Sequence, residues 1–265
     1  MSMKIDYTGK TVLITGGSAG IGYACAELFL ELGAAVSICG TNAARLEDAL
    51  RRLGASGGRV YGEALDVADE KSLRTFAAHT RERFGGIDVW ISNAGVCESY
   101  SIIDTPEEAY ERSFDTNVKA VYLGAKAAYE VMKDRGGVML LASSFASLIP
   151  SVGSGIYAAT KAAVSSMVRS LAAELAPYGI RVNGYIPGVI ETGMNRETIA
   201  ANRAAMEEVI ALQHFGETRD IAYGAAFLAS EYAKYITGIT LEISGGKFGT
   251  QNPKKAWADK ERREG

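Results

Sequence analysis

Short apolar segments alternate with longer segments of helical periodicity along almost the whole chain. The apolar segments cover residues 11–15, 34–39, 59–64, 88–92, 137–143, 180–186 and 239–243. The helical patterns cover 20–33, 42–53, 69–84, a long stretch within 106–133, 155–176 and 219–230. Strand–helix alternation of this length predicts βαβ units with right-handed crossovers, and a parallel sheet that helices cover on both faces. We therefore expect an α/β fold with one doubly wound domain of about seven parallel strands.

Composition and charge exclude several classes of function. No linker rich in Pro, Gly or Ser divides the 265 residues, so we expect one domain over residues 1–246. A net charge of −3 gives no reason to expect nucleic acid as a partner. The three cysteines, Cys25, Cys39 and Cys97, lack CxxC or Cys/His spacing, which argues against a disulfide framework and against a metal site. Without an apolar leader or a run of 18 apolar residues we expect no membrane association, and the cytoplasm is the default location.

The loop after the first predicted strand, TGGSAGIG, carries Gly16, Gly20 and Gly22. Glycine permits positive φ and lets the backbone approach a ligand without a Cβ in the way. Between a strand and the start of a helix, such a loop directs free N–H groups at a phosphate. A tight turn that needs glycine is the alternative explanation, but the position after the first parallel strand favours a dinucleotide.

The spacing TGxxxGIG differs from the GxGxxG of ordinary dinucleotide folds and resembles the short-chain dehydrogenase/reductase family. Further landmarks of that family follow in the same order along the chain. They are Asp66 in ALDVAD, Asn93-Ala94-Gly95, Asn117 in FDTNVKA, Ser144, Tyr157, Lys161, and PGVIET at 187–192. The resemblance runs from about residue 9 to residue 246, and it implies a Rossmann-type fold and an NAD(P)-dependent oxidoreductase.

Tyr157 and Lys161 stand four positions apart in GIYAATKAAV, so both lie on one face of the predicted helix. A nearby ammonium favours the phenolate and lowers the pKa of a tyrosine, which is normally about 10. The resemblance implies that Tyr157 is the general acid or base, and that Ser144 hydrogen-bonds the substrate oxygen. It also implies that Lys161 lowers the Tyr157 pKa and binds the nicotinamide ribose, and that Asn117 holds a water for proton relay. The neighbouring Ser143 is not expected to be the catalytic serine, because successive side chains of a strand point to opposite faces of the sheet.

The resemblance also assigns the residues that bind the cofactor. They are Gly16, Ser18, Gly20, Ile21, Gly22, Thr41, Asp66, Val67, Asn93, Gly95, Tyr157, Lys161, Pro187, Gly188, Ile190 and Thr192. Asp66 and Val67 are expected to flank the adenine. Asn93 and Gly95 are expected to contact its ribose region.

The end of the second strand decides which dinucleotide binds. An acidic residue there would bind the ribose diol of NAD and repel the 2′-phosphate of NADP. Gly40 occupies this position, so the sequence slightly favours NADP(H) over NAD(H). Thr41 and Asn42 can donate hydrogen bonds to a phosphate, and Arg45 follows one turn later. The alternative is a permissive site that uses both cofactors.

The substrate side carries fewer recognisable signals. We expect residues 96–100, Phe145, Ala146, Val152 and 188–190 to line the cleft, and residues 193–216 to form a lid that excludes water. His214 in that lid is interpreted as structural and His79 as solvated, so neither belongs to a triad.

A tail of residues 247–265 follows the usual end of the family pattern and carries six basic against three acidic residues. We expect it to be disordered and solvated. Phe248 and Trp257 support the alternative that it folds over a neighbouring subunit or the mouth of the active site. The resemblance further implies a homo-oligomer, a dimer or tetramer, built through the helices within 106–133 and 155–176.

The function indicated is interconversion of a secondary alcohol and a ketone by hydride transfer. Reduction of 3-oxoacyl thioesters and oxidation of a sugar, polyol or cyclic alcohol remain equal alternatives, so the substrate is a small alcohol or ketone of unknown identity. A non-catalytic regulator that senses NAD(P) on the same fold is the alternative from a different class. Isomerases and dehydratases on related folds are a smaller third possibility.

Overall fold

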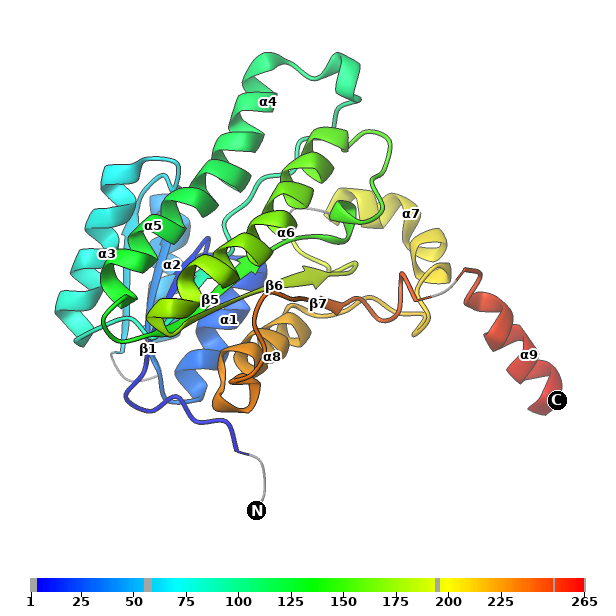
Figure 1. Ribbon diagram of the computed structural model, residues 1–265. Helices are drawn as coiled ribbons and strands as arrows, with labels where there is room; N and C mark the ends of the chain where they lie inside the picture. Colours follow the sequence, from blue (N-terminus) through cyan, green and yellow to red (C-terminus); the bar gives the residue numbers. More distant parts are fainter. Residues whose placement is uncertain (1–3, 55–58, 194–195, 250, 265) are drawn as a thin grey trace.

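The computed structural model describes residues 4–54, 59–193, 196–249 and 251–264, and within these residues seven parallel strands form one sheet (Figure 1). The strands are β1 Thr11–Thr15, β2 Ala35–Gly40, β3 Val60–Ala64, β4 Val89–Ser92, β5 Gly137–Ala142, β6 Ile180–Pro187 and β7 Thr240–Ile243. Each lies within one or two residues of its predicted segment. The predicted doubly wound parallel sheet is confirmed.

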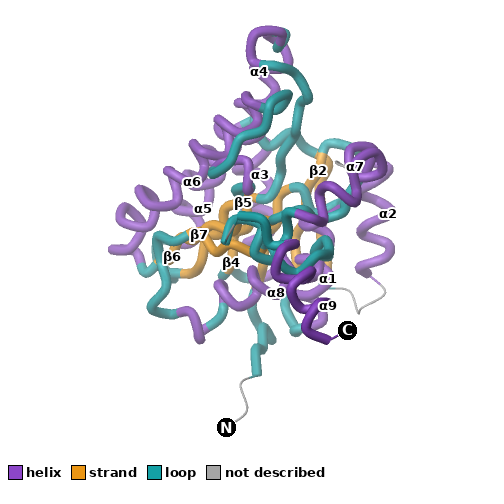
Figure 2. The backbone as a smooth tube through the Cα atoms, turned by 90° about the vertical axis from the view of Figure 1, so that its right-hand side faces the viewer, coloured by secondary structure: helices purple, strands orange, loops and turns teal. Residues whose placement is uncertain are grey.

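The helices of the described residues are α1 Gly20–Glu31, α2 Ala43–Gly54, α3 Glu70–Phe84, α4 Glu107–Phe114, α5 Ala120–Met132, α6 Gly155–Leu175, α7 Arg196–Glu208, α8 Thr218–Ala229 and α9 Lys254–Glu264. All of them except α7 and α9 match predicted helical patterns; α7 lies in the segment predicted as a lid, and α9 in the segment predicted as a disordered tail. Figure 2 shows the strands at the centre of the domain with helices on either side. In the described part of the chain, no helix is long and apolar enough to cross a membrane.

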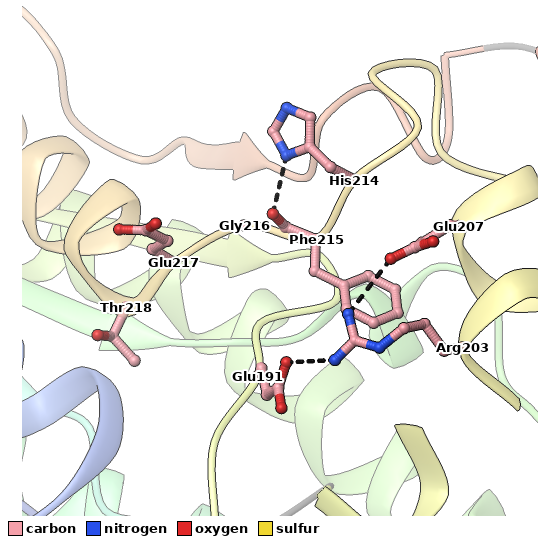
Figure 3. Close-up of a pocket in the computed structure, with 8 residues that line it drawn as sticks. All are labelled: Glu191, Arg203, Glu207, His214, Phe215, Gly216, Glu217 and Thr218. Atoms are coloured by element: carbon pink, nitrogen blue, oxygen red, sulfur yellow. Dashed lines mark hydrogen bonds and ion pairs between the residues drawn. The ribbon is translucent and has the colours of Figure 1, made fainter. Parts of the chain in front are cut away.

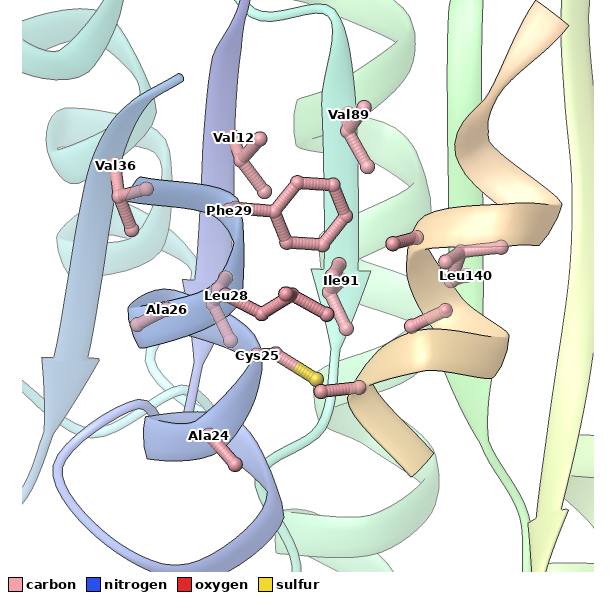
Figure 4. Close-up of a cluster of buried hydrophobic side chains, with 14 of the residues drawn as sticks. Val12, Ala24, Cys25, Ala26, Leu28, Phe29, Val36, Val89, Ile91 and Leu140 are labelled. Carbon is pink, nitrogen blue, oxygen red and sulfur yellow. The ribbon is translucent and has the colours of Figure 1, made fainter. Parts of the chain in front are cut away.

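Alternate residues of each strand supply two separate hydrophobic cores, one on each face of the sheet. Val12 and Ile14 of β1 pack with α1, α2 and α8, whereas Leu13 between them packs with α3, α5 and α6. Figure 4 shows the first core, in which Phe29 of α1 lies against Val12 and Ile91 of neighbouring strands. Burial on both faces explains why the strands are continuous apolar runs.

The strand order β3-β2-β1-β4-β5-β6-β7 places the two halves of the chain on opposite sides of β1 and β4. Thr15 at the end of β1 is paired with Ser92 at the end of β4, and Ser92 with Leu141 near the end of β5. The loops that follow these three strands therefore leave the sheet at the same edge. Such a switch point is where open α/β sheets bind ligands.

The long helix predicted within 106–133 is interrupted. Residues Asp115–Lys119 form a π-helical turn between α4 and α5, and this turn contains Asn117. A π turn adds one residue to the helical repeat and often marks a functional site. It changes the direction of the Asn117 side chain relative to a continuous α-helix.

The expectation of a disordered tail is wrong for residues 254–264, which form helix α9. In Figure 1 this helix extends from the edge of the domain. Trp257 Nε1 donates to the carbonyl oxygen of Ala211 at 2.9 Å, and Lys254 forms an ion pair with Glu208. Contacts with the lid region, which a sequence pattern does not reveal, hold the helix in place.

Candidate active site

The glycines of the first loop are required by close approaches between backbones. Gly16 has φ of 67°, and a Cβ at this residue would stand 2.8 Å from the Cα of Ala94. A Cβ at Gly22 would stand 2.3 Å from the carbonyl oxygen of Gly16. The loops after β1 and β4 can therefore meet only because these side chains are missing.

Helix α1 begins at this loop without a side-chain cap. Its N-cap residue is Ala19, and no side chain accepts a hydrogen bond from the first turn. The N–H groups of the first turn have no partner inside the helix, and together with the helix dipole they form a site for an anion. The methyl group of Thr192 lies 3.6 Å from the position that a Cβ would take at Gly20. The loop after β6 therefore also reaches the start of α1. The cradle fits the pyrophosphate of a dinucleotide.

Asn93 fixes the relation between the loops. Its Nδ2 atom donates to the carbonyl oxygens of Thr15 and Gly16, both at 3.3 Å, and its Oδ1 atom accepts from the Tyr185 hydroxyl at 3.1 Å. Because these bonds engage the side chain inside the protein, Asn93 shapes the floor of the crevice.

The other residues predicted to bind the cofactor lie around the carboxyl edge of the sheet. The exposed Asp66 follows β3 and accepts from the Ala68 N–H at 2.9 Å, while Val67 is buried. Pro187 ends β6, and a Cβ at Gly188 would stand 2.6 Å from the Cα of Ser244. The Ile190 side chain is buried in the core and is therefore not open to a ligand.

The Asn117 side chain joins the loop after β4 to helix α6. Its Oδ1 atom accepts from the Val96 N–H at 2.8 Å, and its Nδ2 atom donates to the Val96 carbonyl at 2.9 Å and to Thr160 Oγ1 at 3.0 Å. Thr160 in turn donates to the Tyr157 carbonyl oxygen at 2.7 Å. Sequence reasoning missed Thr160, although its position directly before Lys161 was a signal. This network fixes the helix that carries the tyrosine and the lysine.

Lys161 is buried beside the tyrosine. Its ammonium donates to the Ala142 carbonyl oxygen at 2.9 Å and lies 5.8 Å from the centroid of the Tyr157 ring. A Cβ at Gly95 would stand 3.3 Å from this ammonium, so glycine leaves room for it. Burial disfavours the charged form and lowers the Lys161 pKa to about 8.

The Tyr157 hydroxyl does not have the low pKa that the sequence suggested. Burial raises its pKa to about 12, and a hydrogen bond with Ser144 acts in the opposite direction with a smaller effect. The loss of hydration around the phenol outweighs what favours its charged form, and the effect of Lys161 on this pKa stays a prediction. At neutral pH the Tyr157 hydroxyl therefore carries its proton.

The two adjacent serines face different surroundings, as predicted. Ser144 hydrogen-bonds Tyr157, and its Oγ atom accepts from the Ala146 N–H at 3.2 Å. Ser143 Oγ lies 2.6 Å from Ser165 Oγ and donates to the Lys161 carbonyl at 3.2 Å. Ser144 thus lies beside Tyr157, whereas Ser143 joins the end of β5 to α6.

The substrate side differs from the expectation at several positions. Val189 and Ile190 are buried in hydrophobic clusters, Ala146 is buried and Val152 is fully exposed, so these four side chains do not form an open cleft wall. Cys97 lies near enough to Tyr157 and Lys161 to affect both pKa values.

The side chains that remain around the cleft come from three separate segments. Glu98 of the predicted cleft segment pairs with Arg112 at 2.7 Å. Phe248 of the tail stacks against Phe145 with ring centroids 5.8 Å apart, which agrees with the alternative that the tail reaches the mouth of the active site.

The lid region forms a cavity of about 570 Å³ outside the catalytic group (Figure 3). Figure 3 shows Arg203 between Glu191 and Glu207, with the guanidinium 4.8 Å from the centroid of the Phe215 ring. The His214 ring lies at the cavity rim with Nδ1 2.9 Å from the Phe215 carbonyl oxygen. The Arg203–Glu191 pair connects α7 to the loop after β6, and the Arg203–Glu207 pair lies within α7. Residues 194 and 195 of the predicted lid lie outside the described residues.

Within the described residues no group of three or more His, Cys, Asp and Glu side chains is arranged to hold a metal ion. His79 contacts Glu63 at 2.8 Å and is partly exposed on α3. The chemistry-bearing groups that the structure brings together are Ser144, Tyr157 and Lys161.

Comparison with known proteins agrees with this geometry. The family model described as enoyl-(acyl carrier protein) reductase matches residues 16–247. L-rhamnose 1-dehydrogenase (NAD(P)(+)) of Azotobacter vinelandii is 37% identical over 247 residues, which cover 90% of this chain and 96% of the relative. A 3-oxoacyl-[acyl-carrier-protein] reductase of Vibrio cholerae is 35% identical and covers 92% of this chain and 99% of its own.

A solved structure extends the likeness to three dimensions. The crystal structure of a short-chain type dehydrogenase/reductase from Mycobacterium marinum has a TM-score of 0.88 and 32% identity, and it covers 93% of this chain and 98% of its own. The residues that the family model matches include the glycine loop, Ser144, Tyr157 and Lys161. The chain belongs to the short-chain dehydrogenase/reductase family of NAD(P)-dependent oxidoreductases.

Proposed function

We propose that the protein interconverts a secondary alcohol and a ketone at Ser144, Tyr157 and Lys161. The observation that carries this proposal is the meeting of these side chains at the sheet edge where the glycine loop forms an anion cradle. The bound nicotinamide dinucleotide supplies the hydride chemistry. The chain's own residues position the substrate oxygen and manage its proton.

Each side chain has a distinct part in that proton management. In ketone reduction the Tyr157 hydroxyl donates a proton to the substrate oxygen, and in alcohol oxidation the phenolate accepts it. Ser144 donates a hydrogen bond to the same oxygen and stabilises the developing alkoxide. The Lys161 ammonium stabilises negative charge on the phenol oxygen and lies where the nicotinamide ribose would bind. Asn117 keeps the helix turn in place through Val96 and Thr160.

Two classes of natural substrate fit this chemistry. The relatives named above include both a sugar dehydrogenase and a 3-oxoacyl-thioester reductase, so both alternatives from the sequence remain. A non-catalytic regulator gains no support, because the four catalytic positions are filled and the relatives carry the names of enzymes. A screen of alcohols and ketones that follows nicotinamide absorbance tests the activity. Turnover that persists unchanged in Tyr157→Phe would refute the proposed chemistry.

The adjacent serines provide a matched test of the site. Ser144→Ala is expected to lower kcat by about 100- to 1000-fold, because it removes a donor to the developing alkoxide. Ser143→Ala removes only the contacts to Ser165 and Lys161, and it is expected to keep kcat within about threefold while costing roughly 1 kcal/mol of stability. Steady-state kinetics and urea unfolding measure both effects. Equal losses of kcat in the two variants would contradict the assignment.

We further propose a preference for NADP(H). A Cβ at Gly40 would stand 2.8 Å from Ser18 Oγ, so the serine hydroxyl occupies the place where an acidic residue would begin. Asn42 Oδ1 accepts from the Arg45 N–H at 2.8 Å, and this cap leaves the exposed Arg45 guanidinium on the first turn of α2. Hydroxyls and a cation at the end of β2 favour a phosphate over a free diol.

Gly40→Asp is expected to shift the NADPH-to-NADH ratio of kcat/KM by about 100-fold towards NADH, because the carboxylate repels the 2′-phosphate and binds the diol. The Ser18 hydroxyl must move by a bond rotation to admit the new side chain. Gly40→Asn is the control, since it adds the same bulk without the charge. A wild type that prefers NADH by tenfold or more, or equal shifts in the two variants, would contradict the proposal.

We also propose that residues 193–216 form a lid and that the protein forms a homo-oligomer. Residues 193–216 carry α7, which the Arg203–Glu191 ion pair holds against the loop after β6, and this placement supports a role in closing the substrate side. Tyr110 of α4 and Tyr122 of α5 are about half exposed. Apolar surface of this kind supports a homodimer or homotetramer built through α4, α5 and α6, which light scattering in solution would measure.

A further inference from the structure

The segment after β7 brings a cation to the catalytic group. Gly245 and Gly246 have φ of 63° and 78°, and these left-handed residues turn the chain back towards the end of β5. The Lys247 ammonium then lies 5.4 Å from the centroid of the Phe145 ring, and Phe248 stacks on the same ring. Phe145 directly follows Ser144 in the sequence, so the cation contacts the residue next to the proposed catalytic serine.

The position of this segment is fixed from the lid side as well. The Leu212 N–H donates to the Gly245 carbonyl oxygen at 3.1 Å, and a Cβ at Gly246 would stand 2.8 Å from the Cβ of Ala211. Lid, tail and the end of β5 therefore meet around Lys247. Lys247 therefore lies between the lid region and the segment that carries Ser144.

Lys247 lacks the acidic partner that other cations of this region have. Arg112 pairs with Glu98, Arg203 with Glu191, and Lys254 with Glu208. Within the described residues, no carboxylate pairs with the Lys247 ammonium, which lies over the Phe145 ring. The side chain is half-buried, and burial without a compensating charge lowers its pKa. A partly desolvated ammonium without a counter-ion is costly unless a ligand supplies the negative charge.

We propose that Lys247 determines substrate specificity by binding an anionic group, a carboxylate or a phosphate, on the alcohol or ketone. This inference rests on the proposed function, and it narrows the substrate class to hydroxy or oxo compounds with such a group. The stacked rings of Phe145 and Phe248 provide apolar surface for the carbon chain between the anion and the reacting carbon. Lys247 is thus a specificity-determining residue and takes no part in the proton transfer.

The test compares ligands that differ in charge and share a ring. Benzoate, phenyl phosphate and uncharged benzamide are titrated by calorimetry into the protein saturated with NADP⁺, which occupies the phosphate site of the glycine loop. At least one of the two anions is expected to bind about tenfold or more tightly than benzamide. A tighter benzoate assigns a carboxylate, and a tighter phenyl phosphate assigns a phosphate. Equal affinities of all three ligands for the wild type overturn the proposal without any variant.

Variants then locate the charge that is responsible. Lys247→Met keeps the apolar stem and is expected to lose the anion preference, whereas Lys247→Arg keeps it. Lys254→Met removes one charge from the same tail and is expected to change nothing. An anion preference that survives in Lys247→Met overturns the proposal. Because calorimetry needs no turnover, this result is independent of the rates of Tyr157→Phe, which test the proposed function.

Discussion

Tyr157→Phe is expected to lower kcat/KM by about 1000-fold or more while dinucleotide affinity stays within about threefold of the wild type. The substitution removes one oxygen and leaves the ring that packs beside Lys161. In the proposed reaction the lost oxygen is the proton donor to the substrate, whereas the glycine loop and the start of α1, which are proposed to bind the pyrophosphate, are untouched. Rate and cofactor affinity should therefore separate.

Steady-state kinetics and fluorescence titration with the reduced dinucleotide measure the two quantities. Tyr7→Phe is the matched control, because it removes a buried hydroxyl that donates to the Ala226 carbonyl at 2.7 Å, in the core between α1 and α8. It is expected to cost roughly 1 kcal/mol of stability and to leave kcat unchanged. A Tyr157→Phe enzyme with more than about a tenth of the wild-type kcat/KM would exclude general acid catalysis by this residue.

Lys161→Met is expected to abolish most activity and to raise the free energy of unfolding at neutral pH. The Lys161 pKa falls from 10.5 to about 8 in the fold, so the unfolded chain binds the proton more tightly. The charged lysine therefore costs stability below pH 8, and this cost decreases as the pH rises from 8 to 10.5. The shift corresponds to about 3 kcal/mol, and loss of the bond to the Ala142 carbonyl offsets roughly 1 kcal/mol of it.

Urea unfolding of the wild type and the variant at pH 6.5 and at pH 9.5, values chosen on either side of about 8, measures this effect. The stability advantage of Lys161→Met should be about 2 kcal/mol at the lower pH and smaller at the higher one. Lys126→Met is the control, because it removes a surface lysine paired with Glu70 and should change stability by less than about 1 kcal/mol. A Lys161→Met protein that is less stable at both pH values would contradict the pKa assigned to the buried ammonium.

Much of the fold could be predicted because the strands are buried on both faces. Val12, Leu13 and Ile14 are all apolar since neighbouring residues face different cores, and such runs are visible in the sequence. The order of the loops then places Ser144 and Tyr157 at one edge of the sheet. The spacing in the sequence was sufficient to predict where these two residues lie, because a strand end and a helix turn have fixed geometry.

Other features depend on contacts that no spacing reveals. The pKa of Tyr157 is controlled by how much water the fold excludes, and the sequence alone suggested the opposite direction. Val189 and Ile190 follow a strand at the expected cleft, yet their side chains turn into hydrophobic clusters. Helix α9 has no buried residues, and its position depends on Trp257 and on the partner that the lid supplies.

The π-helical turn at Asp115–Lys119 sets a limit on how a second subunit can lie along this part of the molecule. One additional residue per turn offsets the outward faces of α4 and α5 by roughly 100°, since an α-helix turns 3.6 residues per revolution. The two helices therefore do not present one continuous ridge. A rigid neighbour aligned with α5 follows its 13 residues, about 20 Å of axis, and then loses registry at the Asn117 turn. The π-helical turn that orients the Asn117 side chain thus also limits how long a continuous contact surface along α4 and α5 can be.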